Sequence, residues 1–227
     1  MKRDGNLMWR IADLNNLYLA FWKAQKGKVR SREVVEFKAM LTENLRELQW
    51  ELLNECVQIG HYRFFTIYDP KERYICAPPF KERVLQHAVM NVCDENFERY
   101  QLSCSYASRK GKGVYAAIEK AQEYQCRFNW YLKMDVRKYF DSIDHRILMN
   151  LLARRFKDAM LLRLFSKLID SYSVTTGKGL PMGNLSSQYF ANHYLAVADH
   201  YLKEKLKVKA VIRYMDDIVI WDNNKIF

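Results

Sequence analysis

The segment RYMDDIVIW, residues 213–221, places two adjacent carboxylates, Asp216 and Asp217, inside an otherwise apolar run. A charged side chain on a buried strand is costly, and an adjacent like charge raises that cost. If the pair lies at the tip of a two-residue hairpin, both side chains reach the edge of a sheet, where divalent cations can balance them. For the pair taken alone, a solvated turn is the alternative interpretation.

A third carboxylate, Asp135, ends a second predicted strand in the segment YLKMDVRKYF, residues 131–140. Mg²⁺ takes oxygen ligands, usually one or two carboxylates together with water and substrate phosphates. Two such ions, about 3.5 to 4 Å apart, activate an attacking oxygen and stabilise a leaving pyrophosphate. We therefore predict that Asp135, Asp216 and Asp217 are catalytic metal ligands for two Mg²⁺ ions, with Mn²⁺ as an alternative ion.

The composition favours a polyanionic partner, because the 227 residues include 37 Lys and Arg against 26 Asp and Glu, a formal charge of +11. Nucleic acid and an anionic membrane surface both satisfy this charge. The chain has no apolar run of the roughly 20 residues that span a bilayer, and polar residues from Arg10 to Asn16 interrupt any signal-peptide core. We expect a cytoplasmic protein with no membrane partner. The five cysteines form no CxxC pair, so neither a disulfide framework nor a zinc site is indicated.

The pattern of apolar residues predicts an α+β protein in which a small antiparallel sheet packs on helices. Helices are expected over 13–24, 31–57, 80–97, 114–125, 144–156, 159–170 and from about 186 onward, the last with a stripe at Phe190, Tyr194, Val197 and Tyr201. Strands are expected in a hairpin divided by Asp69-Pro70, over 128–136, and in a hairpin over 211–221.

Several segments together resemble the polymerase core of reverse transcriptases. YMDD between apolar residues, preceded by a strand ending in D-V-x-x-x-F, looks like the palm of that family, and RYICAPPFKERVLQHAV (73–89) and SYASRKGKGVYAA (105–117) resemble two of its fingers blocks. The resemblance implies an RNA-directed DNA polymerase that uses an RNA template, a DNA or RNA primer and dNTPs. It also implies a right-hand polymerase fold with a helical N-terminal extension (1–60), fingers with part of the palm helices (61–127) and a palm (128–227). Because the sequence stops ten residues after Asp217, we expect no thumb in this chain.

The resemblance also assigns binding roles. To the incoming nucleotide it assigns Arg73, Lys81, Arg109, Val136, Phe140, Met182 and Gly183. To template and primer it assigns Lys110, Lys112, Asn184, Ser187, Gln188, Tyr214 and Met215. Phe140 occupies the position of the steric gate that excludes a 2′-hydroxyl. Taken singly, the basic residues can equally be solvated, Phe140 and Met182 can be core residues, and Asn184 and Ser187 can cap a helix.

One block departs from most reverse transcriptases. The sequence MGNLSSQ, residues 182–188, has Met182 in place of a glutamine and Gln188 in place of a proline. This block and the opening segment NLMWRIADLNNLYLAFWKAQKGK resemble the reverse transcriptases of diversity-generating retroelements, which copy RNA with frequent errors at adenines beside a small basic helical-bundle accessory protein. A group II intron, retron or defence-associated enzyme, and a non-catalytic nucleic-acid-binding module on the same fold, remain the alternatives.

Overall fold

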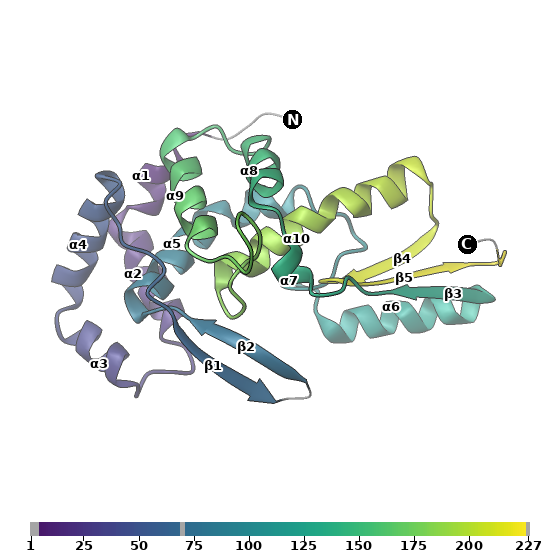
Figure 1. Cartoon of the computed structure of the whole chain (residues 1–227), viewed down its shortest axis with the longest axis horizontal. Coiled ribbons are helices and arrows are strands. Elements are labelled where there is room, and N and C mark those ends of the chain that lie inside the picture. The colour runs from purple at the N-terminus through teal and green to yellow at the C-terminus, as the bar shows by residue number, and fades with distance from the viewer. Residues whose placement is uncertain (1–4, 69–70, 226–227) are drawn as a thin grey trace. The chain divides into compact units, whose positions relative to one another are not determined.

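The computed structural model describes residues 5–68 and 71–225, so the predicted turn at Asp69-Pro70 lies outside the described residues. The chain divides into two compact units (Figure 1). The first comprises Met1–Asn96 and Asp144–Ser187, and the second comprises Phe97–Ile143 and Gln188–Phe227. These bounds do not coincide with the predicted limits at 60 and 127, which remain a prediction about domains.

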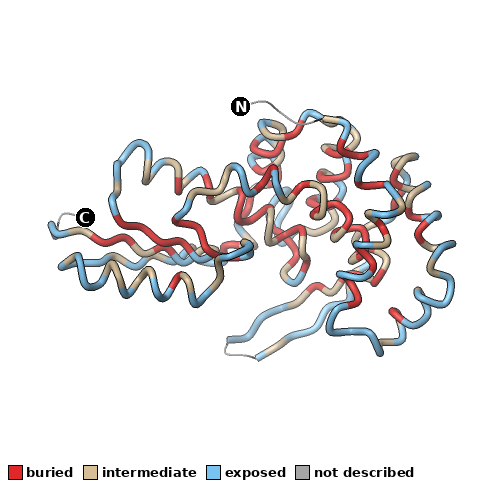
Figure 2. Tube along the Cα trace, turned by 180° about the vertical axis from the view of Figure 1, so that it is seen from behind, coloured by how far each residue is buried: buried red, intermediate tan, exposed pale blue. Residues whose placement is uncertain are grey.

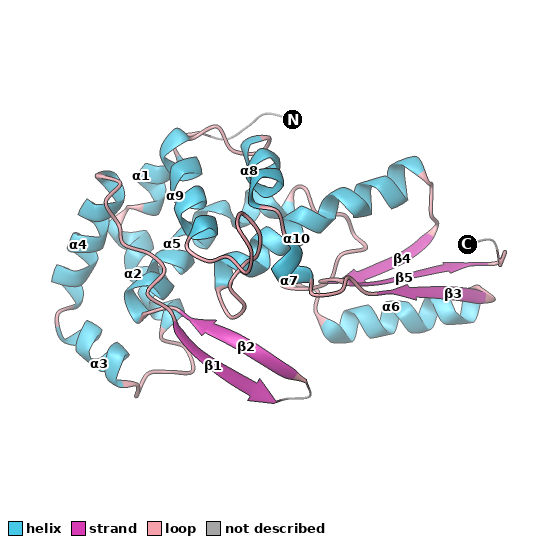
Figure 3. Ribbon diagram, in the orientation of Figure 1, coloured by secondary structure: helices cyan, strands magenta, loops and turns pink. Residues whose placement is uncertain are grey.

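The first unit is mainly helical (Figure 3). Its helices are α1 (Leu7–Ile11), α2 (Leu14–Ala24), α3 (Arg32–Ala39), α4 (Leu41–Leu53), α5 (Phe80–Glu98), α8 (His145–Ala153) and α9 (Ala159–Asp170). Aspartate side chains cap three of them, because Asp13, Asp144 and Asp158 each accept a backbone N–H from the first turn of α2, α8 or α9. The single helix predicted over 31–57 is wrong. Met40, at φ −124° and ψ 47°, leaves the helical region and separates α3 from α4.

A two-stranded antiparallel hairpin completes this unit. It pairs β1 (Arg63–Tyr68) with β2 (Glu72–Ala77), as the sequence predicts. Most of the hairpin is exposed, and only Cys76 near its base is buried (Figure 2). Phe64 and Tyr74 stack across the strands with ring centroids 5.3 Å apart. The hairpin is therefore held at its base and not by a core of its own.

The second unit is built around a three-stranded antiparallel sheet in the order β3-β5-β4. Its elements are α6 (Val114–Arg127), β3 (Trp130–Met134), α7 (Tyr139–Ser142), α10 (Leu185–His200, which begins in the first unit), the π-helical turn η1 (Tyr201–Lys205), β4 (Ala210–Tyr214) and β5 (Asp217–Asp222). Helix α6 covers one face of the sheet through Ala117 and Tyr124, which pack with Ile212 and Trp221. The opposite face carries Val211, Ile218 and Ile220.

Helix α10 differs from the predicted stripe. Phe190 is buried, but Val197 is 42% and Tyr201 56% exposed. The buried face instead includes polar side chains, among them Asn192 and Asp199. The spacing of apolar residues does not reveal this face, because its buried residues include polar side chains that form hydrogen bonds with Arg213 of β4.

Two further observations concern membrane-spanning helices and the cysteines. Among the described residues, no helix has the length and apolar character that crossing a bilayer requires. The five cysteines are all free thiols, with Cys76, Cys93 and Cys104 buried. Burial raises the pKa of Cys104 to about 11, so this thiol is protonated and unreactive at neutral pH.

Candidate functional site

The acidic pair lies where β4 turns into β5. Tyr214 of β4 faces Asp217 of β5, so Met215 and Asp216 are the two turn residues. The predicted tight hairpin is confirmed, with one correction: only Asp216 is in the turn, and Asp217 is the first residue of the strand. Met215 has φ 57°, a left-handed conformation that is uncommon for a residue with a side chain. Two-residue hairpin turns require such a φ because the turn must match the twist of the strands.

Asp135 reaches the same end of the sheet. Strand β3 pairs with β5 in a register whose final pair is Met134 with Ile218. The ladder ends at this pair, and Asp135 and Asp217 are the next residues along β3 and β5 beyond it. Asp135 and Asp217 are both exposed there. The fold therefore brings the third carboxylate to the turn that carries the other two.

The donor set fits a hard divalent cation. Three carboxylates at one sheet end supply the oxygen ligands that Mg²⁺ prefers. Asp217 already attracts a positive charge, since the Lys133 ammonium nitrogen lies 3.3 Å from Asp217 Oδ1. Within the ranges 5–68 and 71–225, however, no three His, Cys, Asp or Glu side chains are gathered tightly enough to hold a metal ion. Metal binding at this end of the sheet therefore requires the three carboxylates to come closer together than they lie in this structure.

The segment after Asp135 is anchored to α10. Tyr139 is buried, and its hydroxyl donates to the Ala191 carbonyl at 2.6 Å. Burial raises the pKa of Tyr139 above its ordinary value, although the positive charge of Arg213 acts in the opposite direction. Phe140, the predicted gate, is half-buried with its ring 5.8 Å from that of Tyr139, and Val136 is also half-buried.

The two predicted phosphate ligands of the first unit have different surroundings. Arg73 lies on the exposed part of β2. Lys81 donates to Glu47 and Glu51, at 2.8 Å each. Burial alone would lower the pKa of Lys81, but these two carboxylates outweigh it and raise that pKa. Two of the three N–H donors of Lys81 are therefore already engaged by carboxylates, whereas Arg73 lies on an exposed strand.

Arg109 differs from its predicted role. Its side chain is 8% exposed and forms an ion pair with Glu98. It also donates to the carbonyls of Leu102, at 2.5 Å, and Ser105, at 2.8 Å. The guanidinium therefore fixes the loop that precedes α6, and its donors are occupied. We leave Arg109 out of the proposed nucleotide site.

The neighbouring lysines lie on the same loop. Lys112 lies over the Tyr106 ring, 4.3 Å from its centroid, and donates to the Ser103 carbonyl at 2.6 Å. Lys110 is exposed. Their assignment to template or primer remains a prediction.

The block MGNLSSQ, which differs from most reverse transcriptases, packs against the base of the β1–β2 hairpin. The Cys76 N–H donates to the Met182 carbonyl at 2.8 Å. Gly183 has φ 108°, and a Cβ there would lie 2.9 Å from Ile75 Cγ2. Glycine is therefore required both for the backbone conformation and for the close approach to β2. The Met182 side chain is half-buried.

The remaining residues of the block belong to the start of α10. Asn184 and Ser187 are buried, at 1% and 2% exposed, so neither is a surface contact for template in this structure. The N-terminus of α10 is capped instead by Gln86, whose Oε1 accepts the N–H of Leu185 at 3.0 Å. Gln188 is half-buried and accepts from Ser108 Oγ at 3.0 Å.

Sequence reasoning missed a buried network beneath this cap. Gln86 donates to Glu82 at 3.1 Å, and Glu82 accepts the Gly60 N–H at 3.0 Å. Burial raises the pKa of Glu82. The signal was present in the sequence, because Glu82 and Gln86 are four residues apart and therefore share one face of α5.

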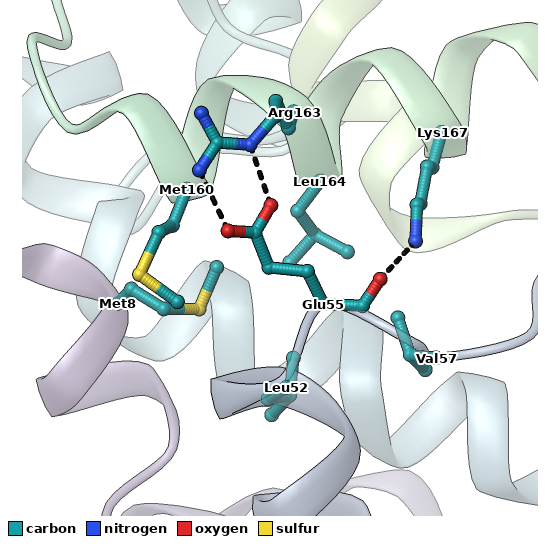
Figure 4. A pocket seen from close by; sticks show the side chains of 8 residues that line it. All are labelled: Met8, Leu52, Glu55, Val57, Met160, Arg163, Leu164 and Lys167. Atoms are coloured by element: carbon teal, nitrogen blue, oxygen red, sulfur yellow. Dashed lines mark hydrogen bonds and ion pairs between the residues drawn. The ribbon is translucent and has the colours of Figure 1, made fainter.

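A small pocket elsewhere in the first unit carries no site. It measures about 10 Å³ and lies among Met8, Leu52 and Leu164, with Glu55, Arg163 and Lys167 at its edge (Figure 4). Arg163 binds the Glu55 carboxylate at 2.5 and 2.6 Å, and Lys167 donates to the Glu55 carbonyl. A space of this size holds one water molecule at most. The charged groups fasten the end of α4 to α9.

Comparison with known proteins places this arrangement in a family. The model of the family described as "Reverse transcriptase (RNA-dependent DNA polymerase)" matches residues 68–225. Protein YkfC of Escherichia coli (strain K12) is 30% identical over 186 residues, 74% of this chain and 48% of YkfC. Group II intron-encoded protein LtrA of Lactococcus lactis subsp. cremoris is 26% identical over 145 residues, 61% of this chain and 24% of LtrA. The chain thus spans less than half the length of both relatives.

Solved structures agree on the fold. One solved chain, from a partial Cas6-RT-Cas1–Cas2 complex, matches this protein with a TM-score of 0.54 at 20% identity. The match covers 95% of this protein and 38% of the solved chain. A truncated apo telomerase from Candida tropicalis has a TM-score of 0.50 at 13% identity, covering 73% of this chain and 44% of that chain. These likenesses support the expected palm and fingers architecture. By the extent of the family match, this chain belongs to the reverse transcriptase family.

Proposed function

We propose that this protein is an RNA-directed DNA polymerase that extends a primer with dNTPs on an RNA template. The observation that carries the proposal is the register of β3 and β5, whose last pair, Met134 with Ile218, makes Asp135 and Asp217 the next residues of the two strands, beside the turn that holds Asp216. Family membership supplies the reaction class. The charge of +11 suits a protein that binds the phosphate backbones of template and primer.

The roles of the chain's own residues follow from their positions. Asp135, Asp216 and Asp217 bind and orient two divalent cations. When bound, Mg²⁺ supplies Lewis-acid chemistry, which lowers the pKa of an attacking hydroxyl and neutralises charge on phosphoryl oxygens. Arg73 presents an exposed guanidinium for a nucleotide phosphate. Phe140 limits the space at the sugar and so selects deoxynucleotides.

Primer extension tests the proposal. Wild-type protein should extend a DNA primer on an RNA template in Mg²⁺, and Asp216→Asn should lose about 10³-fold or more of this rate. Asp222→Asn is the matched control, because Asp222 lies at the other end of β5. Equal extension by wild type and Asp216→Asn would contradict the proposed site. RNA binding without extension by the wild type would favour the non-catalytic binding module.

Within this function, we assign the chain to the error-prone class of diversity-generating retroelements. The block MGNLSSQ supports the assignment. Methionine at position 182 offers soft apolar contact where a glutamine would hydrogen-bond, so base-pair geometry would be checked less strictly. Met182→Gln should lower misincorporation opposite template adenines. An unchanged error spectrum in sequenced cDNA would count against this role for Met182. A small basic helical-bundle protein is the partner expected for this class.

A group II intron enzyme is the second candidate, favoured by the likeness to LtrA. The same cDNA sequencing separates the two, because the retroelement class predicts errors concentrated at adenines. Evenly low errors at all four bases in the wild type would favour the intron class.

A further inference from the structure

A buried arginine lies two residues before the turn that carries Asp216. Arg213 of β4 is 0% exposed, although arginine is rarely buried unless its charge is paired. Its backbone is also fixed, because its N–H donates to the Cys104 carbonyl at 2.8 Å and its carbonyl accepts the Tyr106 N–H at 2.9 Å. The fold therefore encloses a full charge two residues from the turn, and its contacts indicate why.

Every N–H group of this guanidinium has an acceptor. Nε donates to both Asp199 carboxylate oxygens, at 2.8 and 2.9 Å. Nη2 donates to Asp199 Oδ2 at 2.7 Å and to Ser105 Oγ at 3.0 Å. Nη1 donates to Asn192 Oδ1 and to the Met215 carbonyl, both at 2.9 Å. Only arginine has five donors in a planar fork, so lysine cannot reproduce this set.

The bond to Met215 is the one that concerns the site. Met215 is the first turn residue, and its left-handed φ of 57° is a conformation that side-chain-bearing residues seldom adopt. Its carbonyl belongs to the peptide unit that leads into Asp216. Fixing that carbonyl fixes the plane of the peptide, and so the direction in which the Asp216 side chain leaves the turn.

Two side-chain partners of Arg213 lie on helix α10. Asn192 and Asp199 both lie on the buried face of α10, and Asn192 also donates to the Ala107 carbonyl at 2.7 Å. One residue before Asn192, the Ala191 carbonyl accepts the Tyr139 hydroxyl. One turn of α10 thus holds both the segment after Asp135 and the turn that carries Asp216.

We propose that Arg213 is a positioning residue that transmits the placement of α10 to the Met215–Asp216 peptide and so aims the Asp216 carboxylate at the cations. The proposal rests on the proposed polymerase function, because it presumes that Asp216 is a metal ligand. It assigns Arg213 no contact with substrate.

Metal affinity measured without substrate tests the proposal. Mn²⁺ binding to the whole protein, followed by electron paramagnetic resonance, should weaken about tenfold in Arg213→Lys, a size typical when a residue that orients a metal ligand is changed. Ser105→Ala is the matched control, because it removes one bond from Nη2 and leaves the bond to Met215 intact. Its Mn²⁺ affinity should equal that of the wild type.

Hydrogen exchange gives a metal-free readout. In Arg213→Lys, amides of the peptide covering residues 214–217 should exchange faster, while amides of α9 keep their wild-type rates. If Arg213→Lys does not fold, Asn192→Ala replaces it, since this change removes the second acceptor of Nη1. Asn192→Ala should then bind Mn²⁺ several-fold more weakly than Ser105→Ala.

The outcomes are distinct. Wild-type Mn²⁺ affinity in the folded Arg213 or Asn192 variant, together with loss of binding in Asp216→Asn, would overturn the positioning role and leave the metal site standing. Equal Mn²⁺ binding by wild type and Asp216→Asn would overturn the metal site, and the positioning role with it.

Discussion

Lys133 of β3 and Asp217 of β5 form an ion pair diagonally across the two strands, with the ammonium nitrogen 3.3 Å from Asp217 Oδ1. The Lys133 side chain is 62% exposed and the Asp217 side chain 50%, so this ion pair contributes little to stability. A divalent cation can therefore displace the ammonium at small cost. The pair shows that the end of the sheet already attracts positive charge, which is what the proposed site requires.

Arg73 and Arg109 should separate binding from stability. Arg109→Ala removes a nearly buried guanidinium that holds Glu98 and two carbonyls, and should cost about 2 kcal/mol of unfolding free energy. Arg73→Ala should stay within about 0.5 kcal/mol because Arg73 is exposed, yet raise the KM for dNTPs about tenfold. Denaturant unfolding and steady-state kinetics measure the two effects. The reverse pattern would show that Arg109, and not Arg73, serves the nucleotide.

Gly183→Ala should loosen the block MGNLSSQ from the hairpin. The new Cβ would lie 2.9 Å from Ile75 Cγ2 at a φ of 108°, so we expect a loss of about 3 kcal/mol in unfolding free energy. Gly177→Ala is the control, because Gly177 also has a positive φ but no atom within 4 Å of its added Cβ. It should cost about 1 kcal/mol. Equal losses in the two variants would mean that contact with β2 is unimportant.

His87 should make the protein less stable in acid. Burial, and then the charges of Arg83 and Lys23, lower the pKa of His87 from 6.5 to about 4. His87 therefore binds a proton more readily in the unfolded chain than in the folded protein. The free energy of unfolding is not affected by this difference above pH 6.5, and it decreases as the pH falls from 6.5 towards 4. In thermal unfolding between these pH values, His87→Gln should lose less stability than wild type. The exposed His61 supplies the control His61→Gln, which should follow the wild-type curve.

Phe140→Ala should relax sugar selection. Removing the ring opens space beside Tyr139, so the ratio of kcat/KM for dNTP over rNTP should fall by about 100-fold. Tyr139 is not a suitable site for this test, because its buried hydroxyl anchors the segment to α10. Unchanged discrimination in Phe140→Ala would refute the gate and make Phe140 a packing residue.

The sequence predicted those features that depend on local pattern and short-range pairing. The apolar strands around Asp216 and Asp217 predicted the hairpin, and the strand ending at Asp135 predicted its neighbour. Apolar spacing also predicted α2 to within a residue, and the helix expected over 80–97 is α5. The spacing of apolar residues is a local property that the sequence alone shows.

What the sequence did not predict depends on tertiary contacts. Arg109 looked like a free cation, and only the fold brings Glu98 to it. The role of Arg213 was not predicted, because its partners Asp199 and Asn192 lie 14 and 21 residues earlier in the sequence, on helix α10. The break at Met40 interrupts a pattern whose apolar spacing continues on both sides. In each case the residue type is uninformative until its neighbour is known.

The most direct test of the central claim is diffraction at the manganese absorption edge from crystals of this protein grown with Mn²⁺. The account predicts an anomalous peak at the end of the β3–β5–β4 sheet, with oxygens of Asp135 and of the Asp216–Asp217 pair directly coordinated to the metal. Manganese bound there without Asp135, or no manganese at this end of the sheet, would contradict it.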